Sequence, residues 1–185
     1  MFLNLRKFIW FVKSQYLIFI IGKFGNFSYL APGYTIIGYR KLFIGNKVRI
    51  SFNLRAEAHG NGSIYINDNV SIGNDLHLSS FDDLIIEKNV TISSRVFIGS
   101  LVHSYEAIDV HIMNQKLSGS KTIIGENSFL GTGAVILPGT TLGKQCIVGA
   151  NSVVKGDFGN YQVLAGNPAR VIKQFNIISN KWEKC

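Results

Sequence analysis

Aliphatic residues recur at an unbroken step of six in the second half of the sequence. They are Ile124, Leu130, Ile136, Leu142, Val148 and Val154. The same step occurs upstream in shorter runs: Ile44 and Ile50, then Ile66, Ile72 and Leu78, then Ile86, Ile92 and Ile98. An amphipathic helix has a period of 3.6 residues and a simple strand a period of 2. A period of six therefore indicates a repeat architecture.

A triangular coil explains this period. Each unit would be a short strand followed by a turn, and three units would close one coil of about 18 residues that stacks on the next. The aliphatic residue would point inward, and so would the residue four positions later, which is small in most units. These second inward residues are Val48, Val70, Val90, Val96, Ser128, Ala134, Thr140, Cys146 and Ser152.

The residue three positions after each aliphatic would occupy a tight corner. Many of these positions hold residue types that tolerate the left-handed backbone a corner needs. They are Asn53, Asn69, Asp75, Asn89, Asn127, Gly133, Gly139 and Asn151. Two independent positional rules thus agree on one register, and they predict an all-β fold, a parallel β-helix.

The register breaks where residues are inserted. The longest break is the 26-residue step from Ile98 to Ile124, one full coil plus eight residues, and shorter breaks follow Ile50 and Leu78. An insertion in a regular solenoid usually forms a loop on one face, often the functional one. The long insertion contains His103.

Two stretches carry a resemblance to a known family. The sequences GENSFLGTGAVILPGTTLGKQCIVGANSVV (residues 125–154) and LAGNPARVIK (residues 164–173) resemble the hexapeptide-repeat acyltransferases, especially the galactoside, maltose and polysaccharide O-acetyltransferase branch. The resemblance spans about residues 33–175. It implies a left-handed coil, a homotrimer, and acetyl-CoA as a co-substrate bound in a groove between subunits, with no permanently bound cofactor.

The resemblance places the family's essential histidine at His103, in IGSLVHSYE (residues 98–106). Imidazole is well suited to take the proton of a sugar hydroxyl near neutral pH. Related polysaccharide enzymes show Asp-His-x-His here, and Ser100 stands in place of that aspartate. Glu106 is a candidate replacement that would orient the imidazole. The alternatives are a solvated carboxylate at Glu106 and an ordinary surface histidine at His103.

The resemblance also implies residues that bind the donor and the acceptor. Gly131 and Thr132 would form the oxyanion and donor groove, and coenzyme A would contact Ala150, Lys155, Arg170 and Lys173. Asp75 would bind the acceptor sugar. Plainer alternatives remain open. Asp75 could be only a corner residue, and Arg170 and Lys173 could be ordinary solvated charges. At Lys155 the sequence reads Lys-Gly-Asp, which departs from the family's Thr-Lys-Asp pattern. The other histidines, His59, His77 and His111, are interpreted as structural, and no metal site is expected.

The positive charge is concentrated at the N-terminal end. Residues 1–56 hold nine Lys and Arg and no Asp or Glu, whereas the other 129 residues sum to −1. Because these cations alternate with Phe, Trp, Ile and Leu, they favour an anionic membrane surface over nucleic acid. No cleavable signal is expected. The segment is predicted to form an amphipathic helix that contacts a membrane, covers the open end of the β-helix, or does both.

These observations predict three parts and one function. Residues 1–30 would be the basic amphipathic segment, residues 31–160 the β-helix with an inserted loop at about 99–121, and residues 161–185 a tail with a short helical segment. The predicted function is O-acetylation of a sugar in an O-antigen or other surface polysaccharide, in the cytoplasm or at the inner face of its membrane. The alternatives are N-acetylation of a nucleotide-linked amino sugar and a non-catalytic β-helix used for assembly.

Overall fold

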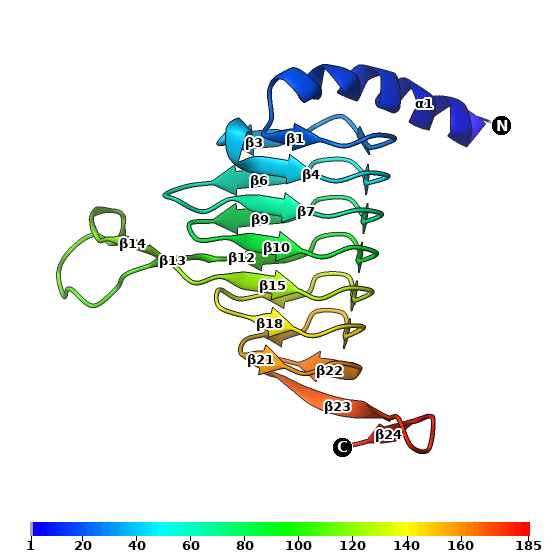
Figure 1. Ribbon diagram of the computed structural model, residues 1–185. Helices are drawn as coiled ribbons and strands as arrows, with labels where there is room; N and C mark the ends of the chain where they lie inside the picture. Colours follow the sequence, from blue (N-terminus) through cyan, green and yellow to red (C-terminus); the bar gives the residue numbers. More distant parts are fainter. Residues whose placement is uncertain (1) are drawn as a thin grey trace.

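The computed structural model describes the backbone of residues 2–185 and the side chains of residues 5–185. Helix α1 (Phe2–Ser14) and the 3-10 helix η1 (Gln15–Phe19) precede a stack of short strands wound into a triangular β-helix (Figure 1). The predicted mostly-β solenoid is therefore confirmed. No helix within residues 2–185 is long and apolar enough to cross a bilayer.

Three parallel sheets form the faces of the β-helix. The first face contains β1 (Lys23–Phe24), β4 (Leu42–Ile44), β7 (Ile64–Ile66), β10 (Leu84–Ile86), β15 (Thr122–Ile124), β18 (Thr141–Leu142) and β21 (Asp157–Phe158). The second face contains β2 (Tyr29–Leu30), β5 (Arg49–Ile50), β8 (Ser71–Ile72), β11 (Thr91–Ile92), β16 (Phe129–Leu130), β19 (Ile147–Val148) and β22 (Gln162–Gly166). The third face contains β3 (Thr35–Ile37), β6 (Arg55–Ala58), β9 (His77–Ser80), β12 (Phe97–Gly99), β17 (Val135–Ile136) and β20 (Val153–Val154).

Three edges join these faces. The chain leaves the first face at the first edge (for example residues 125–128), the second face at the second edge (131–134), and the third face at the third edge (137–140). Parallel pairing keeps equivalent positions of successive coils in line, as in Ile92↔Leu130↔Val148. A residue's place in the repeat therefore decides which edge it occupies.

The core confirms the inward positions predicted from the repeat. All nine of the second inward residues expose 1% or less of their surface, and the aliphatic positions beside them are buried as well. Burying one such aliphatic side chain contributes roughly 1.5–3 kcal/mol. Because every coil contributes its own layer, the core runs continuously along the stack.

The corner positions are also confirmed. The eight predicted Asn, Asp and Gly corners have φ between 55° and 80°, in the left-handed region. Lys47, Arg95 and Gln145 adopt the same conformation at equivalent corners, although their side chains gave no such signal. Hydrogen bonds link some corners of adjacent coils, as from Asn69 Nδ2 to Asn89 Oδ1 at 2.9 Å. Stacking thus imposes the corner geometry even on less suited residues.

The N-terminal helix covers the open end of the β-helix. Trp10 is buried and packs edge-on against Phe52, with ring centroids 4.9 Å apart. The Ser14 hydroxyl accepts a hydrogen bond from the Leu30 N–H at 3.1 Å. The first coil begins at β1, with Lys23, so the β-helix starts earlier than the expected boundary at residue 31.

The C-terminal segment corrects one prediction, because residues 161–185 contain no helix. Strand β22 completes the second face, the chain reverses at Asn167–Pro168, and β23 (Ala169–Asn176) and β24 (Lys181–Lys184) continue that sheet in antiparallel fashion. Phe175 packs on Trp182, with ring centroids 5.4 Å apart. The open hydrogen-bonding edge of β22 and the β-branched and aromatic residues of β23 favour a strand over a helix.

Candidate functional site

The long insertion forms an arm that projects from the third edge, between β12 and β15 (Figure 1). Because β15 lies on the face that directly follows the face of β12, the step from Ile98 to Ile124 does not contain the full coil expected from its length. Strands β13 (Leu101–His103) and β14 (Leu117–Gly119) form an antiparallel hairpin at its base. Ser100 Oγ donates a hydrogen bond to the Asp82 carbonyl oxygen at 2.5 Å, and Ser120 N–H donates to the Ser100 carbonyl at 2.9 Å. The first bond attaches the base of the arm to the coil above it, and the second joins the two chain segments of that base.

His103 ends the first strand of this hairpin, opposite Leu117. Its side chain is half-buried, and its Nδ1 atom is buried without a hydrogen-bond partner among the residues described. A buried polar atom normally has a partner. A histidine that acts as a base at Nε2 commonly has the other ring nitrogen held by a hydrogen bond. The single chain therefore supplies the imidazole but leaves its second nitrogen unsatisfied.

The rest of the arm is held by its own side chains. The Gln115 side chain bonds to the backbone N–H and carbonyl of Ala107 and to the Val110 carbonyl. His111 Nδ1 accepts from Met113 N–H at 3.2 Å and so begins the 3-10 helix η3 (Ile112–Asn114). The arm also exposes apolar side chains to solvent: Tyr105, Ile108, Val110, Ile112 and Met113.

Glu106 lies in the same arm but does not reach His103. Its side chain is exposed, and no ion pair or hydrogen bond of its carboxylate occurs in the part of the chain that the structure describes. This geometry favours the solvated alternative for Glu106.

The second edge brings together the predicted donor residues. A Cβ atom on Gly131 would lie 2.7 Å from the backbone nitrogen of Ala150, and Asn151 N–H donates to the Thr132 carbonyl at 2.9 Å. Gly131 N–H donates to the Val148 carbonyl at 2.8 Å. Among residues 2–185, the N–H groups of Thr132 and Ala150 have no acceptor. Thr132 and Ala150 thus offer two free donors one coil apart.

Arg170 lies further along the same edge. It pairs with Ala165 at the end of β22, and Ala165 lies directly below Gly149, the neighbour of Ala150. Its side chain is exposed. Lys173 is also exposed but pairs with Val163, farther from the edge. The second edge therefore offers two free amides followed by a cation.

Asp75 occupies the second edge too, in a coil above Thr132. It is a corner residue with φ of 58°, and its carboxylate accepts a hydrogen bond from Asn53 Nδ2 at 2.9 Å. The side chain is exposed. Its role in the ladder of corner residues accounts for these contacts without an acceptor sugar.

The structure does not bring His103 and the donor residues together within one chain. Lys155 follows β20 at the third edge, the edge that carries the arm with His103. Thr132, Ala150 and Arg170 lie at the second edge. These two edges are at opposite ends of the strands of the third face. A complete site would need the third edge of one chain to meet the second edge of another.

A charged cluster on the third face was not predicted from the sequence. Glu57 is almost fully buried, and its carboxylate lies 2.7 Å from Arg55 Nη2 and 3.4 Å from His77 Nε2. Burial raises the pKa of Glu57, but hydrogen bonds and charge from Arg55 and His77 outweigh it, so the pKa lies below its usual value. The alternating Arg55-x-Glu57 in a strand, with His77 in the next coil, is the sequence signal for this cluster.

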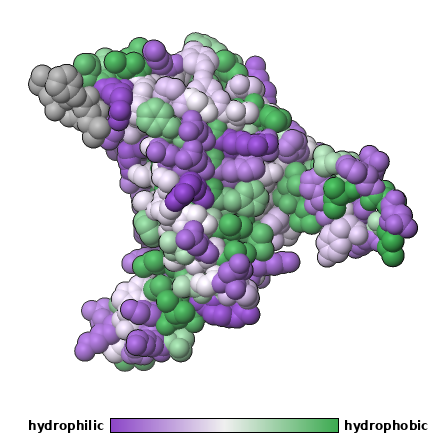
Figure 2. Space-filling view, turned by 180° about the vertical axis from the view of Figure 1, so that it is seen from behind, coloured by the Kyte–Doolittle hydropathy of each residue, from purple (hydrophilic) through white to green (hydrophobic). Residues whose placement is uncertain are grey.

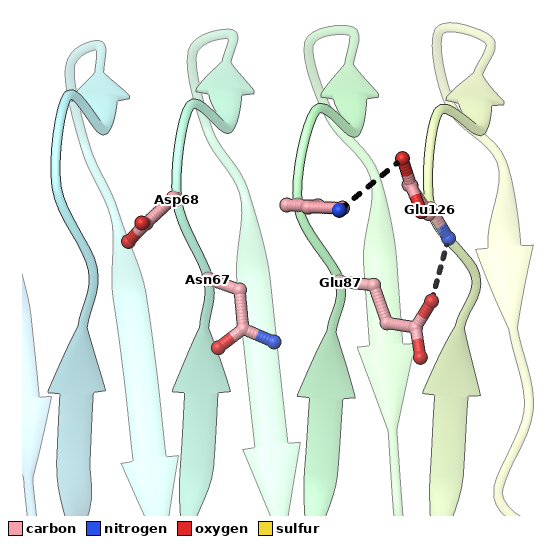
Figure 3. A pocket seen from close by; sticks show the side chains of 5 residues that line it. Asn67, Asp68, Glu87 and Glu126 are labelled. Atoms are coloured by element: carbon pink, nitrogen blue, oxygen red, sulfur yellow. Dashed lines mark hydrogen bonds and ion pairs between the residues drawn. The ribbon is translucent and has the colours of Figure 1, made fainter.

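An open groove of about 440 Å³ on the first edge lies away from both halves of the site. Figure 3 shows its polar side chains at successive corners, including Asn67, Asp68, Glu87 and Glu126. Glu87 accepts a hydrogen bond from the Glu126 backbone N–H at 2.8 Å. A hydrogen bond from the Asn46 backbone N–H lowers the pKa of Asp68. These hydrogen bonds link successive coils, so the polar side chains of the groove are explained by coil stacking.

The six-residue repeat and the triangular coil together define a hexapeptide-repeat β-helix, and a histidine-bearing arm projects from its third edge. The family described as "Bacterial transferase hexapeptide (six repeats)" matches residues 121–156. The chain is 36% identical over 147 residues to WbbJ of Escherichia coli strain K12, whose name describes a lipopolysaccharide biosynthesis O-acetyl transferase. That match covers 76% of this chain and 75% of WbbJ. The chain belongs to this family of hexapeptide-repeat transferases, and its coil is a left-handed β-helix.

Two further similarities agree with this result. A galactoside O-acetyltransferase from the same strain is 32% identical over 129 residues, which cover 69% of this chain and 59% of that enzyme. Some other relatives are longer, and the chain spans about half of their length. The crystal structure of a mutant of AntD, an N-acyltransferase from Bacillus cereus in complex with dTDP and coenzyme A, superposes with a TM-score of 0.76. It is 20% identical and covers 88% of this chain and 89% of that chain.

Proposed function

We propose that the protein is an acetyl-CoA-dependent O-acetyltransferase that acetylates a sugar hydroxyl in a surface polysaccharide or its precursor. The observation that carries this proposal is His103, presented by the arm at the third edge of a chain that belongs to the hexapeptide-repeat transferases. The resemblance to WbbJ favours a lipopolysaccharide O-antigen unit as the acceptor.

The proposed reaction is direct transfer in a ternary complex. His103 Nε2 takes the proton of the sugar hydroxyl while that oxygen attacks the thioester carbonyl of acetyl-CoA. The new C–O bond forms an oxyanion, which a backbone N–H can stabilise. The C–S bond then breaks, and the thiolate of coenzyme A receives the proton from the imidazolium. Of the two predicted donors Gly131 and Thr132, only Thr132 has a free N–H to serve this role.

A covalent route through cysteine has no support in this fold. Cys146 is fully buried, and its thiol donates a hydrogen bond to the Gly159 carbonyl at 3.1 Å. Burial raises the pKa of the Cys146 thiol, which disfavours the thiolate nucleophile. Cys185 is exposed at the far C-terminal end, away from the arm.

We propose that the protein works as a homotrimer with active sites between subunits. Cyclic trimers form heterologous contacts, in which one surface of a subunit meets a different surface of the next. Such a contact can place the His103 edge of one subunit against the Thr132 and Ala150 edge of its neighbour. The exposed apolar residues of the arm, together with Phe129 on the second face, suit such an interface. The neighbouring subunit or the substrate would then supply the partner of His103 Nδ1.

In this assembly, coenzyme A would lie along the second edge. Thr132 and Ala150 amides would bond to its pantetheine arm, and Arg170, with Lys173 or Lys155, would contact its phosphates. Asp75 remains a candidate for the acceptor sugar, because it lies on the same edge as Thr132. We place the enzyme in the cytoplasm, at the inner face of the membrane, because its N-terminal end is strongly basic and apolar.

The test is a measurement of coenzyme A release from acetyl-CoA with a panel of sugars, nucleotide-linked sugars and polysaccharides. A Cys185→Ser variant removes the exposed thiol that would react with thiol reagents. O-acetyl products are cleaved by mild alkali, whereas N-acetyl products resist it, so the product distinguishes the two chemistries. If only amino sugars are turned over and the product is stable to alkali, the enzyme is an N-acetyltransferase and the proposed O-acetylation is wrong. If the protein does not bind coenzyme A, the alternative of a non-catalytic β-helix used for assembly describes it better.

A further inference from the structure

The N-terminal end of the β-helix carries an apolar surface that the fold itself does not bury. Helix α1 and η1 lie across this end of the stack (Figure 1). Large side chains on them are exposed, with Phe8 60% and Phe19 79% accessible. We call this set the end surface; it consists of Leu5, Phe8, Ile9, Val12, Ile18 and Phe19.

Helix α1 is apolar on two opposite sides. At 3.6 residues per turn, Leu5, Phe8 and Val12 lie on one side, roughly opposite the buried Trp10 and Ser14. At this end Leu17 of η1 and the following Ile21 belong to the core, while Trp10 packs against Tyr29 and Phe52, so the outer side of α1 covers no part of the core. A helix that only caps a solenoid needs a polar outer side for solubility. The outer apolar side of α1 therefore requires another occupant.

The charges around the end surface indicate which occupant it fits. Lys7 and Lys13 of α1 and Lys23 of β1 are exposed, and Arg6 stacks over the Trp10 ring at 5.0 Å. No Asp or Glu occurs in residues 1–56, and Asp68 of a later coil is the acidic residue whose pKa Lys23 helps to lower. Protein interfaces are depleted in lysine. Lysine beside Phe, Leu and Trp on a short helix is typical of segments that lie at the interface of an anionic membrane.

We propose that the end surface docks the protein onto an anionic lipid bilayer, with α1 lying in the plane of the membrane. Apolar side chains of α1 and η1 would enter the region between head groups and acyl chains, while Lys7, Lys13 and Lys23 meet anionic head groups. In Figure 2 hydrophobic residues lie among hydrophilic ones at the top of the molecule, the end that α1 covers. The described helices are too short to span the bilayer, so the protein lies on its surface.

The arrangement of the β-helix makes this docking directional. Because α1 crosses the end of the stack, the coil axis would stand upright from the membrane (Figure 1). Three inter-strand spacings separate β3 in the first coil from β12, where the arm begins, which is about 15 Å. In a trimer with parallel coils, all three end surfaces would face the same plane, and their binding would reinforce one another. The docking itself does not depend on the proposed chemistry.

The test is cosedimentation of the full-length protein with vesicles of phosphatidylglycerol mixed with phosphatidylcholine, compared with vesicles of phosphatidylcholine alone. We expect binding to the anionic vesicles that weakens as salt rises, because the attraction of exposed charges is screened. Replacing Leu5, Phe8 and Val12 by Ser should lower the partition coefficient at least tenfold. Replacing Lys7 and Lys13 by Gln should lower it about thirtyfold on anionic vesicles only, since each lysine contributes about 1 kcal/mol.

A matched control is the pair Ile177→Ser and Ile178→Ser at the opposite end, which are also highly exposed and should leave binding unchanged. The thermal midpoint of each variant verifies that the fold is intact. Absence of vesicle binding at low salt, or equal binding by the Leu5, Phe8 and Val12 variant, would overturn the proposal. Loss of a larger assembly in that variant, with vesicle binding retained, would instead assign the end surface to contact between copies of this chain.

Discussion

Gly131 and Ala150 approach each other so closely across adjacent coils that a side chain on Gly131 would lie 2.7 Å from the Ala150 backbone nitrogen. The Val148 carbonyl would lie 2.8 Å from the same added atom. Both neighbours are backbone atoms and cannot move aside. Gly131 is thus needed for stacking at the second edge, while its neighbour Thr132 has the free amide.

The first prediction concerns this contact. Gly131→Ala should lower the free energy of unfolding by about 1–3 kcal/mol, because the added methyl group forces the two coils apart. It should also raise the KM for acetyl-CoA, since Thr132 and Ala150 would shift. Denaturant unfolding and initial rates measure the two effects. Gly159→Ala is the control, because the nearest atom to its added carbon is a flexible Gln162 side chain at 3.7 Å. Equal stability of the two variants would contradict the stacking argument.

The second prediction concerns the base. His103→Ala should lower kcat at least ~100-fold on the true acceptor, the loss expected for a general base, while the protein stays folded and trimeric. His59→Ala, outside the arm, is the control and should keep its activity. A near wild-type kcat for His103→Ala would rule out the proposed mechanism.

The third prediction concerns active sites shared between subunits. Ala150→Tyr places a bulky side chain on the exposed second edge and should block coenzyme A binding. His103→Ala and Ala150→Tyr should each be inactive alone. Mixed trimers made by refolding the two together should recover about a quarter of wild-type activity, because some interfaces combine two intact edges. No recovery in verified mixed trimers would place the whole site within one chain.

The fourth prediction concerns the Glu57 cluster and pH. The lowered pKa of Glu57 stabilises the folded state at pH values above the usual glutamate pKa, and this contribution disappears as pH falls through the folded-state pKa. Glu57→Gln should therefore cost about 1–2 kcal/mol at neutral pH. The cost should vanish in strong acid, where both proteins carry a neutral side chain.

Thermal melts of wild type and Glu57→Gln across the acid range measure this difference. Glu106→Gln is the matched control, because Glu106 is exposed and should leave the thermal midpoint unchanged at every pH. A constant difference between wild type and Glu57→Gln from neutral to strongly acid pH would show that the carboxylate charge is not involved.

The sequence alone is enough to predict the repeat. Inward positions such as Ile124 and Ser128, and corners such as Asn127, follow from spacing because each coil repeats the same local geometry. It also located the arm, since an insertion that interrupts a fixed period must leave the coil. Corners at Lys47 and Arg95 were not predictable, because stacking between coils overrides the preference of the individual residue.

Relations between different coils could be seen only in the three-dimensional fold. The C-terminal tail became β23 and β24 because β22 left an open sheet edge, which no local pattern reveals. The candidate site is divided between two edges because its loops lie at opposite ends of the third-face strands. The amide of Thr132 is free because of its position at the corner. The outer side of α1 is exposed because the helix turns its opposite side, with Trp10 and Ser14, toward the β-helix. A periodic pattern specifies which side chains point inward, whereas three-dimensional packing decides which of the others remain available for binding.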